Sequence, residues 1–294
     1  MTPSRSLFHQ VRGLRLHVRC WGDPADPPLV LLHGWMDVSA SFQFMVDALD
    51  GRWHVLAPDW RGFGLAQWAP GGVWCADYMA DLDACLDLVC PGAAVPVVGH
   101  SMGGNVANLY AGVRPERVSA LVLAEGFGLR ATTAGQAPER YGRWLDELRE
   151  GSRLKPYADF CAVADRLMSN NPRLTRERAQ FLSRHWAREA DGGGVEVAAD
   201  PAHKRINPVL YRFEEAQACW QRIRAPVLWV WGGEGEWVRR WMGEDPADLA
   251  RRRAAYARLS EVTIREAGHM MHQDQPEAFA AAVESFIAAA GSPP

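Results

Sequence analysis

Residues 97–104 constrain the fold more than any other part of the chain, because they read VVGHSMGG. An apolar run leads into the pattern G-x-S-x-G, and residues 105–113 (NVANLYAGV) then suit a helix. Gly99 and Gly103 lack a Cβ and leave room for a sharp turn around Ser101. The helix N-terminus there favours developing negative charge. This context predicts a nucleophile elbow rather than an idle serine in a glycine-rich turn.

Short apolar runs alternate with helical patterns along the chain. Residues 28–32 (PLVLL) are typical of a strand buried on both faces of a parallel sheet, and residues 11–18 alternate around a glycine as in a β-hairpin. Further strands are expected at 54–57, 95–98, 118–124, 227–231 and 262–264, and helices at roughly 41–49, 77–90, 103–113 and 275–289. The alternation predicts an α/β fold with a mostly parallel, doubly wound sheet.

One interval breaks this rhythm. Residues 127–222 contain no convincing buried strand and carry many Arg and Glu side chains, so we expect a helical cap inserted into a core of residues 1–126 and 223–294. The glycine run at 192–194 predicts a flexible loop within it. We expect this cap to fold over the serine and exclude water. Residues 201–208 are expected to form a solvated cap loop rather than to bring polar side chains over the pocket.

The overall composition excludes several classes of protein. The chain has 294 residues and a formal charge of −3, which argues against nucleic acid as a partner. No apolar run approaches the roughly 20 residues of a membrane span, and the first residues lack the apolar stretch of a signal peptide. The six cysteines are scattered without a CxxC pair, which favours reduced thiols over disulfides or a zinc site. We therefore expect a cytoplasmic protein; the sequence predicts no oligomeric state.

Hydrolysis by a serine needs a base, an orienting carboxylate and two N–H donors for the oxyanion. The predicted base is His269, which follows the last strand, with Gly268 allowing the loop to bend toward the serine. His272 is the rival candidate. If His269 is the base, His272 is expected to support it from behind or to lie at the surface.

The sequence LLHGW at residues 31–35 predicts the oxyanion-binding loop. The backbone N–H groups of Trp35 and Met102 are the expected donors, and His33 is expected to hold the loop by hydrogen bonds. Trp35 and Asp37 are candidates to line the pocket. Asp37 is equally suited to capping a turn or the following helix.

Five motifs together resemble the α/β-hydrolase fold family, most closely its serine-nucleophile members related to serine hydrolase-like proteins and carboxylesterases. They are HGW (33–35), DWRGFG (59–64), GHSMGG (99–104), PERV (115–118) and GHMMHQDQPE (268–277). The resemblance implies the chain order serine, acid, histidine, with no metal and no cofactor. Haloalkane dehalogenases and epoxide hydrolases share the architecture but use an aspartate where this chain has Ser101. In DWRGFG, we expect Asp59 and Arg61 to share an architectural polar network, with substrate contact by Trp60 or Phe63 as the lesser alternative.

The acid departs from the simplest family pattern. Many members place an aspartate in a G-x-x-D turn after the seventh strand, whereas residues 232–238 here read GGEGEWV, so that Glu236 fits the spacing from Gly233. Glu125, which ends the apolar run 118–124, is the other candidate and the preferred one. A carboxylate there is costly to bury unless it is paired, and an imidazole N–H is a suitable partner. Glu234 remains a third possibility.

These residues predict a serine hydrolase that cleaves carboxylic esters of small to medium, largely apolar molecules through an acyl-enzyme. Phe127 follows directly from the catalytic face and is expected to line the pocket. The alternatives are a carbon–carbon bond hydrolase with the same triad, a cofactor-free perhydrolase side activity, and a ligand-binding protein on a hydrolase fold.

Overall fold

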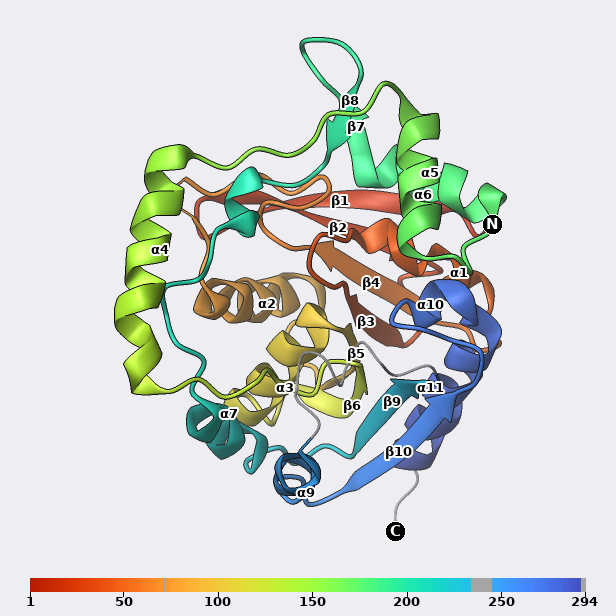
Figure 1. Ribbon diagram of the computed structural model, residues 1–294. Coiled ribbons are helices and arrows are strands. Elements are labelled where there is room, and N and C mark those ends of the chain that lie inside the picture. The colour runs from red at the N-terminus through yellow and green to blue at the C-terminus, as the bar shows by residue number, and fades with distance from the viewer. Residues whose placement is uncertain (71, 234–244, 292–294) are drawn as a thin grey trace.

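A mixed sheet lies at the centre of the molecule (Figure 1). The computed structural model describes residues 1–70, 72–233 and 245–291. In the described chain the large sheet has the strand order β1-β2-β4-β3-β5-β6-β9-β10. Its strands are β1 (Ser4–Val11), β2 (Leu14–Trp21), β3 (Pro28–Leu32), β4 (His54–Asp59), β5 (Val95–His100), β6 (Val118–Ala124), β9 (Val227–Gly232) and β10 (Leu259–Ile264). Strands β4, β3, β5, β6, β9 and β10 pair in parallel, each with its neighbours in that order, while β2 is antiparallel to both β1 and β4. The α/β fold and the N-terminal hairpin expected from the sequence are confirmed.

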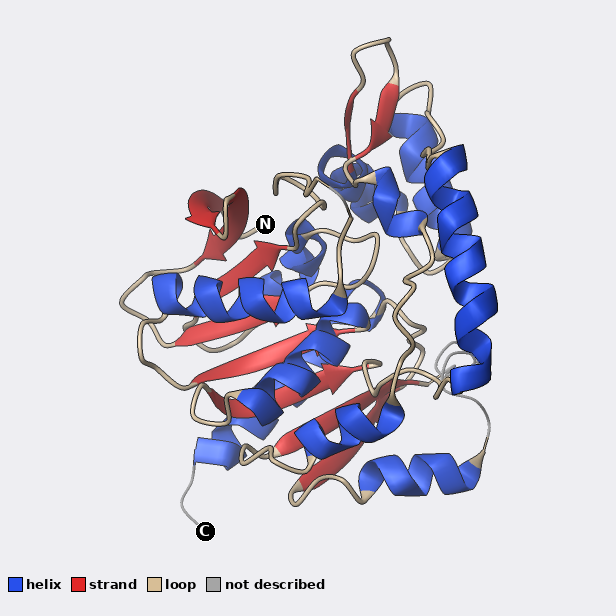
Figure 2. Cartoon of the chain, turned by 90° about the vertical axis from the view of Figure 1, so that its left-hand side faces the viewer, coloured by secondary structure: helices blue, strands red, loops and turns tan. Residues whose placement is uncertain are grey.

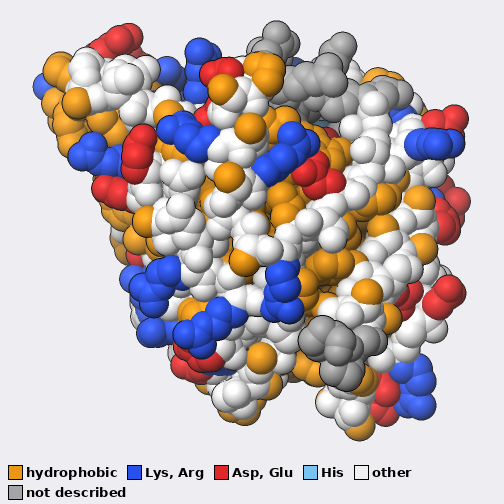
Figure 3. Space-filling model, turned by 90° about the horizontal axis from the view of Figure 1, so that it is seen from below, with side chains coloured by type: hydrophobic (Ala, Val, Ile, Leu, Met, Phe, Trp, Pro, Cys, Tyr) orange, Lys and Arg blue, Asp and Glu red, His pale blue; other side chains and the backbone are white. Residues whose placement is uncertain are grey.

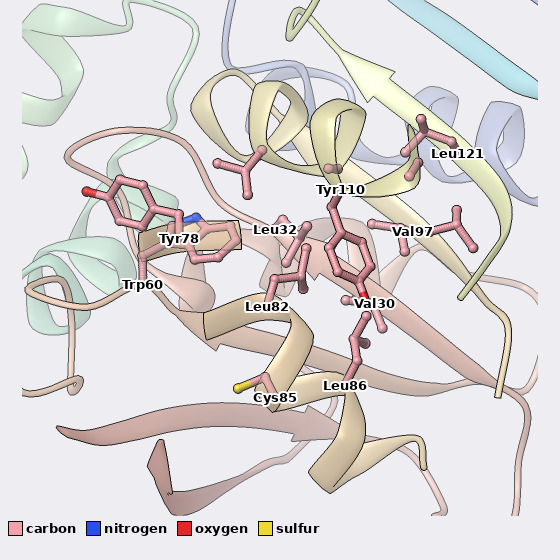
Figure 4. Packing of buried hydrophobic residues seen from close by; sticks show 14 of the residues in the cluster. Val30, Leu32, Trp60, Tyr78, Leu82, Cys85, Leu86, Val97, Tyr110 and Leu121 are labelled. Atoms are coloured by element: carbon pink, nitrogen blue, oxygen red, sulfur yellow. The ribbon is translucent and has the colours of Figure 1, made fainter. Parts of the chain in front are cut away.

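Helices cover both faces of this sheet. They are α1 (Gln43–Asp47), α2 (Cys75–Val89), α3 (Met102–Val113), α9 (Pro246–Arg253), α10 (Met271–Asp274) and α11 (Pro276–Gly291). Val30 and Leu32 of β3 pack in one hydrophobic cluster with α2 and α3, and Leu29 and Leu31 pack in a second with α1 and α11. Because successive side chains of a strand point to opposite faces, β3 contributes to both cores. Figure 4 shows the first cluster, in which Leu82 and Leu86 of α2 face Tyr110 of α3.

The chain between β6 and β9, called here the β6–β9 segment, contains further helices and a small hairpin. Its elements are α4 (Ala137–Glu150), α5 (Phe160–Asn170), α6 (Arg176–Trp186), β7 (Ala187–Glu189), β8 (Val195–Val197) and α7 (Phe213–Trp220). Figure 2 shows α4, α5 and α6 together on one side of the sheet. Helix α7, by contrast, packs on α3, where a Cβ on Gly112 would lie 1.9 Å from the carbonyl oxygen of Cys219. The extent of a cap stays a prediction.

One local expectation differs from the structure. The helix expected at 41–49 divides into a 3₁₀ helix, Ser39–Phe42, and the short α1. The glycine run at 192–194 lies in the turn that connects β7 to β8.

None of the described helices is both long and apolar enough to cross a membrane. On the face seen in Figure 3, acidic and basic side chains are interspersed rather than separated by sign.

Candidate active site

Ser101 occupies a strained turn between β5 and α3. Its backbone has φ 51° and ψ −116°, a region that non-glycine residues rarely adopt. A Cβ on Gly99 would lie 2.5 Å from the Cα of Gly104, and a Cβ on Gly103 would lie 2.2 Å from the carbonyl oxygen of Leu32. Both positions therefore require glycine. The structure has the sharp strand-to-helix turn that the sequence predicts.

Glu125 and His269 form a hydrogen-bonded pair. Glu125 Oε2 accepts a hydrogen bond from His269 Nδ1 at 2.6 Å, and Oε1 accepts one from the backbone N–H of Gly232 at 3.0 Å. The Glu125 side chain is 1% exposed and the His269 side chain 20% exposed. Glu125 also has a positive φ of 50°, directly after β6. The carboxylate therefore fixes which face of the imidazole is free for chemistry, namely the Nε2 side.

Burial acts on both members of this pair. It raises the pKa of Glu125 to about 7, with the hydrogen bond from Gly232 opposing the change and the charge of Asp274 adding to it. It lowers the pKa of His269 to about 3, with His272 adding to the change and Asp37 opposing it. Both shifts disfavour the charged forms. His269 is therefore neutral near pH 7, which is the form that can accept a proton.

The structure brings one of the acid candidates to the histidine. Glu125 binds His269, as the preferred prediction requires. Glu236 and Glu234 lie outside the described residues. The position of His272 is also defined. It is fully buried, so the expectation that it lies at the surface is wrong, and the alternative of a supporting residue agrees with its position.

A buried group of polar residues lies behind His269. His272 Nε2 is 3.7 Å from Asp37 Oδ2, and the Asp37 carboxylate accepts a hydrogen bond from Ser41 Oγ at 2.8 Å. His100 Nε2 lies 2.8 Å from the carbonyl oxygen of His269 and donates to it. Its ring centroid is 4.6 Å from that of His272. The hydrogen bond from His100 fixes the backbone that carries His269.

The same buried group contains residue types that bind metals. One possible ligand atom each from Asp37, His100 and His272 lies within 4.8 Å of the others. Sequence reasoning missed this grouping, although His100 next to the serine and His272 three residues after the base were visible signals. The expectation of no metal stays a prediction.

The oxyanion-binding loop predicted at 31–35 lies against Ser101. An ideal Cβ on Gly34 would be 3.3 Å from Ser101 Cβ, so the loop backbone directly neighbours the serine. His33 is buried and donates from Nδ1 to the Gly34 carbonyl oxygen at 2.8 Å. Its Nε2 accepts from the backbone N–H of Trp60 at 3.0 Å, while the Trp60 indole donates to the His33 carbonyl oxygen. His33 thus holds the loop by hydrogen bonds, as expected.

The two predicted oxyanion donors, Trp35 and Met102, directly follow Gly34 and Ser101, the two residues that neighbour each other here. Met102 is the first residue of α3, directly after Ser101. Trp35 follows Gly34, and its side chain is half exposed. Its indole N–H donates to the carbonyl oxygen of His203 at 3.2 Å, which connects the loop to the β6–β9 segment.

The residues of DWRGFG form two separate networks rather than the shared network expected. Asp59 accepts hydrogen bonds from His17 at 2.7 Å and from two backbone N–H groups, one of them that of Leu65. Arg61 instead pairs with Asp81, with Nε 2.6 Å from Oδ2. The expectation was wrong because the two side chains, which are two positions apart, contact different elements. Asp59 binds His17 of β2, whereas Arg61 binds Asp81 of α2.

Two aromatic positions lie inside the protein. Phe127 is buried, with its ring centroid 4.5 Å from Trp229 and 4.4 Å from Trp231, so the structure gives it a packing role. Its role in lining the pocket stays a prediction. Phe63 stacks on His203 at 3.9 Å between centroids. The expectation of a solvated loop at 201–208 is therefore wrong for His203, whose pKa burial lowers to about 4.

Comparison with known proteins supports the fold. A family model described as alpha/beta hydrolase fold matches residues 27–276. A serine hydrolase-like protein from Danio rerio is 25% identical over 279 residues, covering 92% of this chain and 85% of that protein. The 2-(acetamidomethylene)succinate hydrolase of Mesorhizobium japonicum is 25% identical over 274 residues, covering 93% and 92%.

The fold comparison extends to solved structures. The thioesterase domain from the curacin biosynthetic pathway has a TM-score of 0.84 at 22% identity, covering 96% of this chain and 99% of that one. The family match itself includes Ser101, Glu125 and His269 within its range. The chain therefore belongs to the alpha/beta hydrolase fold family.

Proposed function

We propose that this protein is a serine hydrolase that cleaves carboxylic esters through an acyl-enzyme. The family and its hydrolase relatives support hydrolysis in general. The observation that carries the finer proposal is the 2.6 Å contact between Glu125 and His269, combined with the strained backbone of Ser101 at the start of α3. An acid that orients a neutral histidine near a partly exposed serine is the arrangement that activates a hydroxyl.

In the proposed first step, Ser101 Oγ attacks the carbonyl carbon while His269 Nε2 accepts the hydroxyl proton. Glu125 stabilises the imidazolium that forms. The backbone N–H groups of Trp35 and Met102 hold the oxyanion, and their contribution is greatest when negative charge develops on that oxygen. The imidazolium then returns its proton to the leaving alcohol, and the acyl group stays on the serine.

In the second step, His269 takes a proton from water, and the hydroxide oxygen attacks the acyl carbon. The tetrahedral intermediate collapses, the proton goes to Ser101 Oγ, and the carboxylic acid leaves. The buried side of the site, formed by Glu125 and the Asp37–His100–His272 group, excludes water from Nδ1. Only Nε2 is then available to exchange protons with the substrate or water.

The proposed substrates are small to medium esters with an apolar acyl or alcohol part. Trp35 is half exposed beside the serine and offers an apolar surface for such a group. Relatives carry different hydrolase names, and one fold neighbour is a thioesterase domain, so thioesters are the first other class to assay. A carbon–carbon bond hydrolase and a ligand-binding protein are the outcomes that the experiment below distinguishes.

The test is labelling with a fluorophosphonate probe, read by intact mass. We expect one adduct on the wild type, none on Ser101→Ala, and one on Ser119→Ala, an exposed serine of β6 that serves as the control. A series of p-nitrophenyl esters then tests the substrate class. An adduct that persists in Ser101→Ala contradicts the assignment of the nucleophile. A labelled protein that hydrolyses vinylogous diketones but no ester supports the carbon–carbon alternative, and an unlabelled folded protein supports ligand binding.

A further inference from the structure

A cleft lies apart from the catalytic residues, between the N-terminal hairpin and the β6–β9 segment. Its volume is about 930 Å³, and neither Ser101, Glu125 nor His269 lines it. One wall comes from β2 and the loop 64–68, and the other from α6 and β7. Figure 1 shows β7 and β8 beyond β1 and β2 at the same end of the molecule. The two parts of the chain therefore enclose the cleft jointly.

Basic side chains dominate the polar groups of this cleft. Its walls include four arginines, namely Arg15, Arg19, Arg184 and Arg188, and also His185, whose pKa burial lowers to about 4, so that it adds no charge near pH 7. The acidic side chains among its lining residues are Asp59, which is engaged by His17 and backbone N–H groups, and the exposed Glu189. This concentration of one sign contrasts with the mixed charges on the face in Figure 3.

Three of these arginines have no acidic partner. Arg188 pairs with Glu196 at 2.8 Å. In the described part of the chain, Arg15, Arg19 and Arg184 form no ion pair. A protein surface that holds several unpaired arginines around one cavity has a positive potential, which attracts and concentrates anions.

Arg19 is the most informative of the three because it is only 8% exposed. Its Nη1 donates to Ser4 Oγ at 2.9 Å, but its buried Nε meets no hydrogen-bond partner among the described residues. A buried guanidinium with an unsatisfied N–H group is costly, and such groups in proteins normally have a partner. Burial also lowers the pKa of Arg19, with the charge of Asp59 opposing the change.

Aromatic rings hold the arginines of the opposite wall. The guanidinium of Arg188 lies 4.5 Å from the ring centroid of Trp68, and that of Arg184 lies 5.3 Å from Phe160. Such stacking orients a guanidinium, and that of Arg184, which forms no ion pair with the described residues, keeps its N–H groups free for an anion. Leu65 and Val38 add apolar surface to the same cleft.

We propose that this cleft binds a small organic anion, with a carboxylate or phosphate group held by Arg15, Arg19 and Arg184 and an apolar part against Leu65 and Trp68. Guanidinium groups suit both anions, because each offers paired oxygens to the arginine fork. Arg19 belongs to β2 and Arg184 to α6, so the bound anion joins the core to the β6–β9 segment. The proposal stands independently of the reaction at Ser101.

The experiment measures binding by calorimetry and thermal unfolding with three probes: inorganic phosphate, hexanoate and the uncharged hexanamide. We expect saturable binding of phosphate or hexanoate, weaker at high salt, a raised unfolding temperature, and no binding of hexanamide. If phosphate binds and hexanoate does not, the site recognises a phosphate ester. The reverse result identifies a carboxylate.

The variants Arg15→Gln and Arg184→Gln remove exposed arginines of the cleft and should leave the fold intact. Each should weaken binding by about tenfold or more, which corresponds to the loss of one charge-assisted contact. The control is Arg176→Gln, which removes an exposed arginine of the same α6 that pairs with Asp165 instead. Equal affinity in wild type and both cleft variants, equal weakening in the control, or no saturable binding of either anion would overturn the proposal.

Discussion

Glu125 and His269 are 144 positions apart in the sequence, yet Glu125 Oε2 lies 2.6 Å from His269 Nδ1. Glu125 directly follows β6, and His269 lies in the loop after β10, so β9 separates the two strands from which they come. The N–H of Gly232, at the end of β9, donates to the other carboxylate oxygen. Three neighbouring parallel strands thus fix the pair from their carboxyl ends, where ligand sites of such sheets lie.

The first prediction concerns Glu125→Gln. The amide keeps the size of the side chain but loses the charge that stabilises the imidazolium, so kcat should fall by about 10³- to 10⁴-fold. Ester hydrolysis at saturating substrate measures this. The control is Glu277→Gln, an exposed residue in the first turn of α11, which should keep wild-type activity. Full activity in Glu125→Gln together with loss in Glu236→Gln would assign the role to Glu236.

The pH profile gives a second prediction about the same pair. Burial raises the pKa of Glu125 to about 7, so the carboxylate becomes protonated and loses its charge as the pH falls through that value. The lowered pKa of His269 keeps the imidazole neutral over the same range. The wild-type rate should therefore fall below about pH 7, and Glu125→Gln should lack this acidic limb. An acidic limb unchanged in the variant would attribute it to another group.

The third prediction concerns Gly103→Ala in the turn after the serine. The new Cβ would lie 2.2 Å from the carbonyl oxygen of Leu32 and 2.6 Å from that of His33, both in the strand end that leads to the oxyanion loop. Backbone must move, at a cost of about 1–3 kcal/mol in the free energy of unfolding. Labelling by the fluorophosphonate should slow sharply. Chemical denaturation and the labelling rate measure the two effects.

Gly142→Ala is the matched control for this substitution. Gly142 lies in α4, and a Cβ there would meet no atom within 4 Å. In a helix interior, alanine is about 0.5–1 kcal/mol more favourable than glycine, so this variant should be slightly more stable and fully labelled. A Gly103→Ala protein that labels as fast as wild type would contradict the argument from the close packing of the turn.

The fourth prediction concerns the buried Asp59. Desolvation raises its pKa, but the hydrogen bond and charge of His17, with the N–H of Leu65, outweigh this effect and lower the pKa overall. A carboxylate with a lowered pKa stabilises the fold above its unfolded pKa of about 3.9, and that stability is lost as the pH falls into the acid range. Asp59→Asn should cost about 3–5 kcal/mol at pH 7 and reduce the acid dependence of unfolding.

Urea unfolding at pH 7 and in the acid range checks this prediction. Asp26→Asn is the control, because Asp26 pairs at 3.1 Å with the highly exposed Arg52. An exposed pair of this kind contributes about 0–1 kcal/mol. Equal losses in the two variants would contradict the role assigned to the buried hydrogen bonds of Asp59.

Local patterns account for what the sequence predicted well. The glycines around Ser101 mark the turn in the local sequence, and the apolar runs mark the parallel strands. The preference for Glu125 followed from the cost of burying a carboxylate at a strand end, and that carboxylate meets His269. Features that depend on which element packs nearby were not predictable. Asp59 and Arg61 are two positions apart, yet they contact β2 and α2 respectively, and no local pattern separates them.

The last prediction concerns the contact between Trp35 and the β6–β9 segment. The Trp35 indole donates to the carbonyl oxygen of His203, and this hydrogen bond connects the loop beside Ser101 to the 3₁₀ helix Pro201–Lys204. Trp35→Phe removes the N–H while keeping an aromatic ring. Loss of one neutral hydrogen bond is worth about 0.5–1.5 kcal/mol, so KM should rise by about two- to tenfold while kcat changes little. Steady-state kinetics on the best ester should be compared with Trp74→Phe, an exposed tryptophan before α2. A wild-type KM in Trp35→Phe, or an equal rise in the control, would show that this hydrogen bond does not support substrate binding.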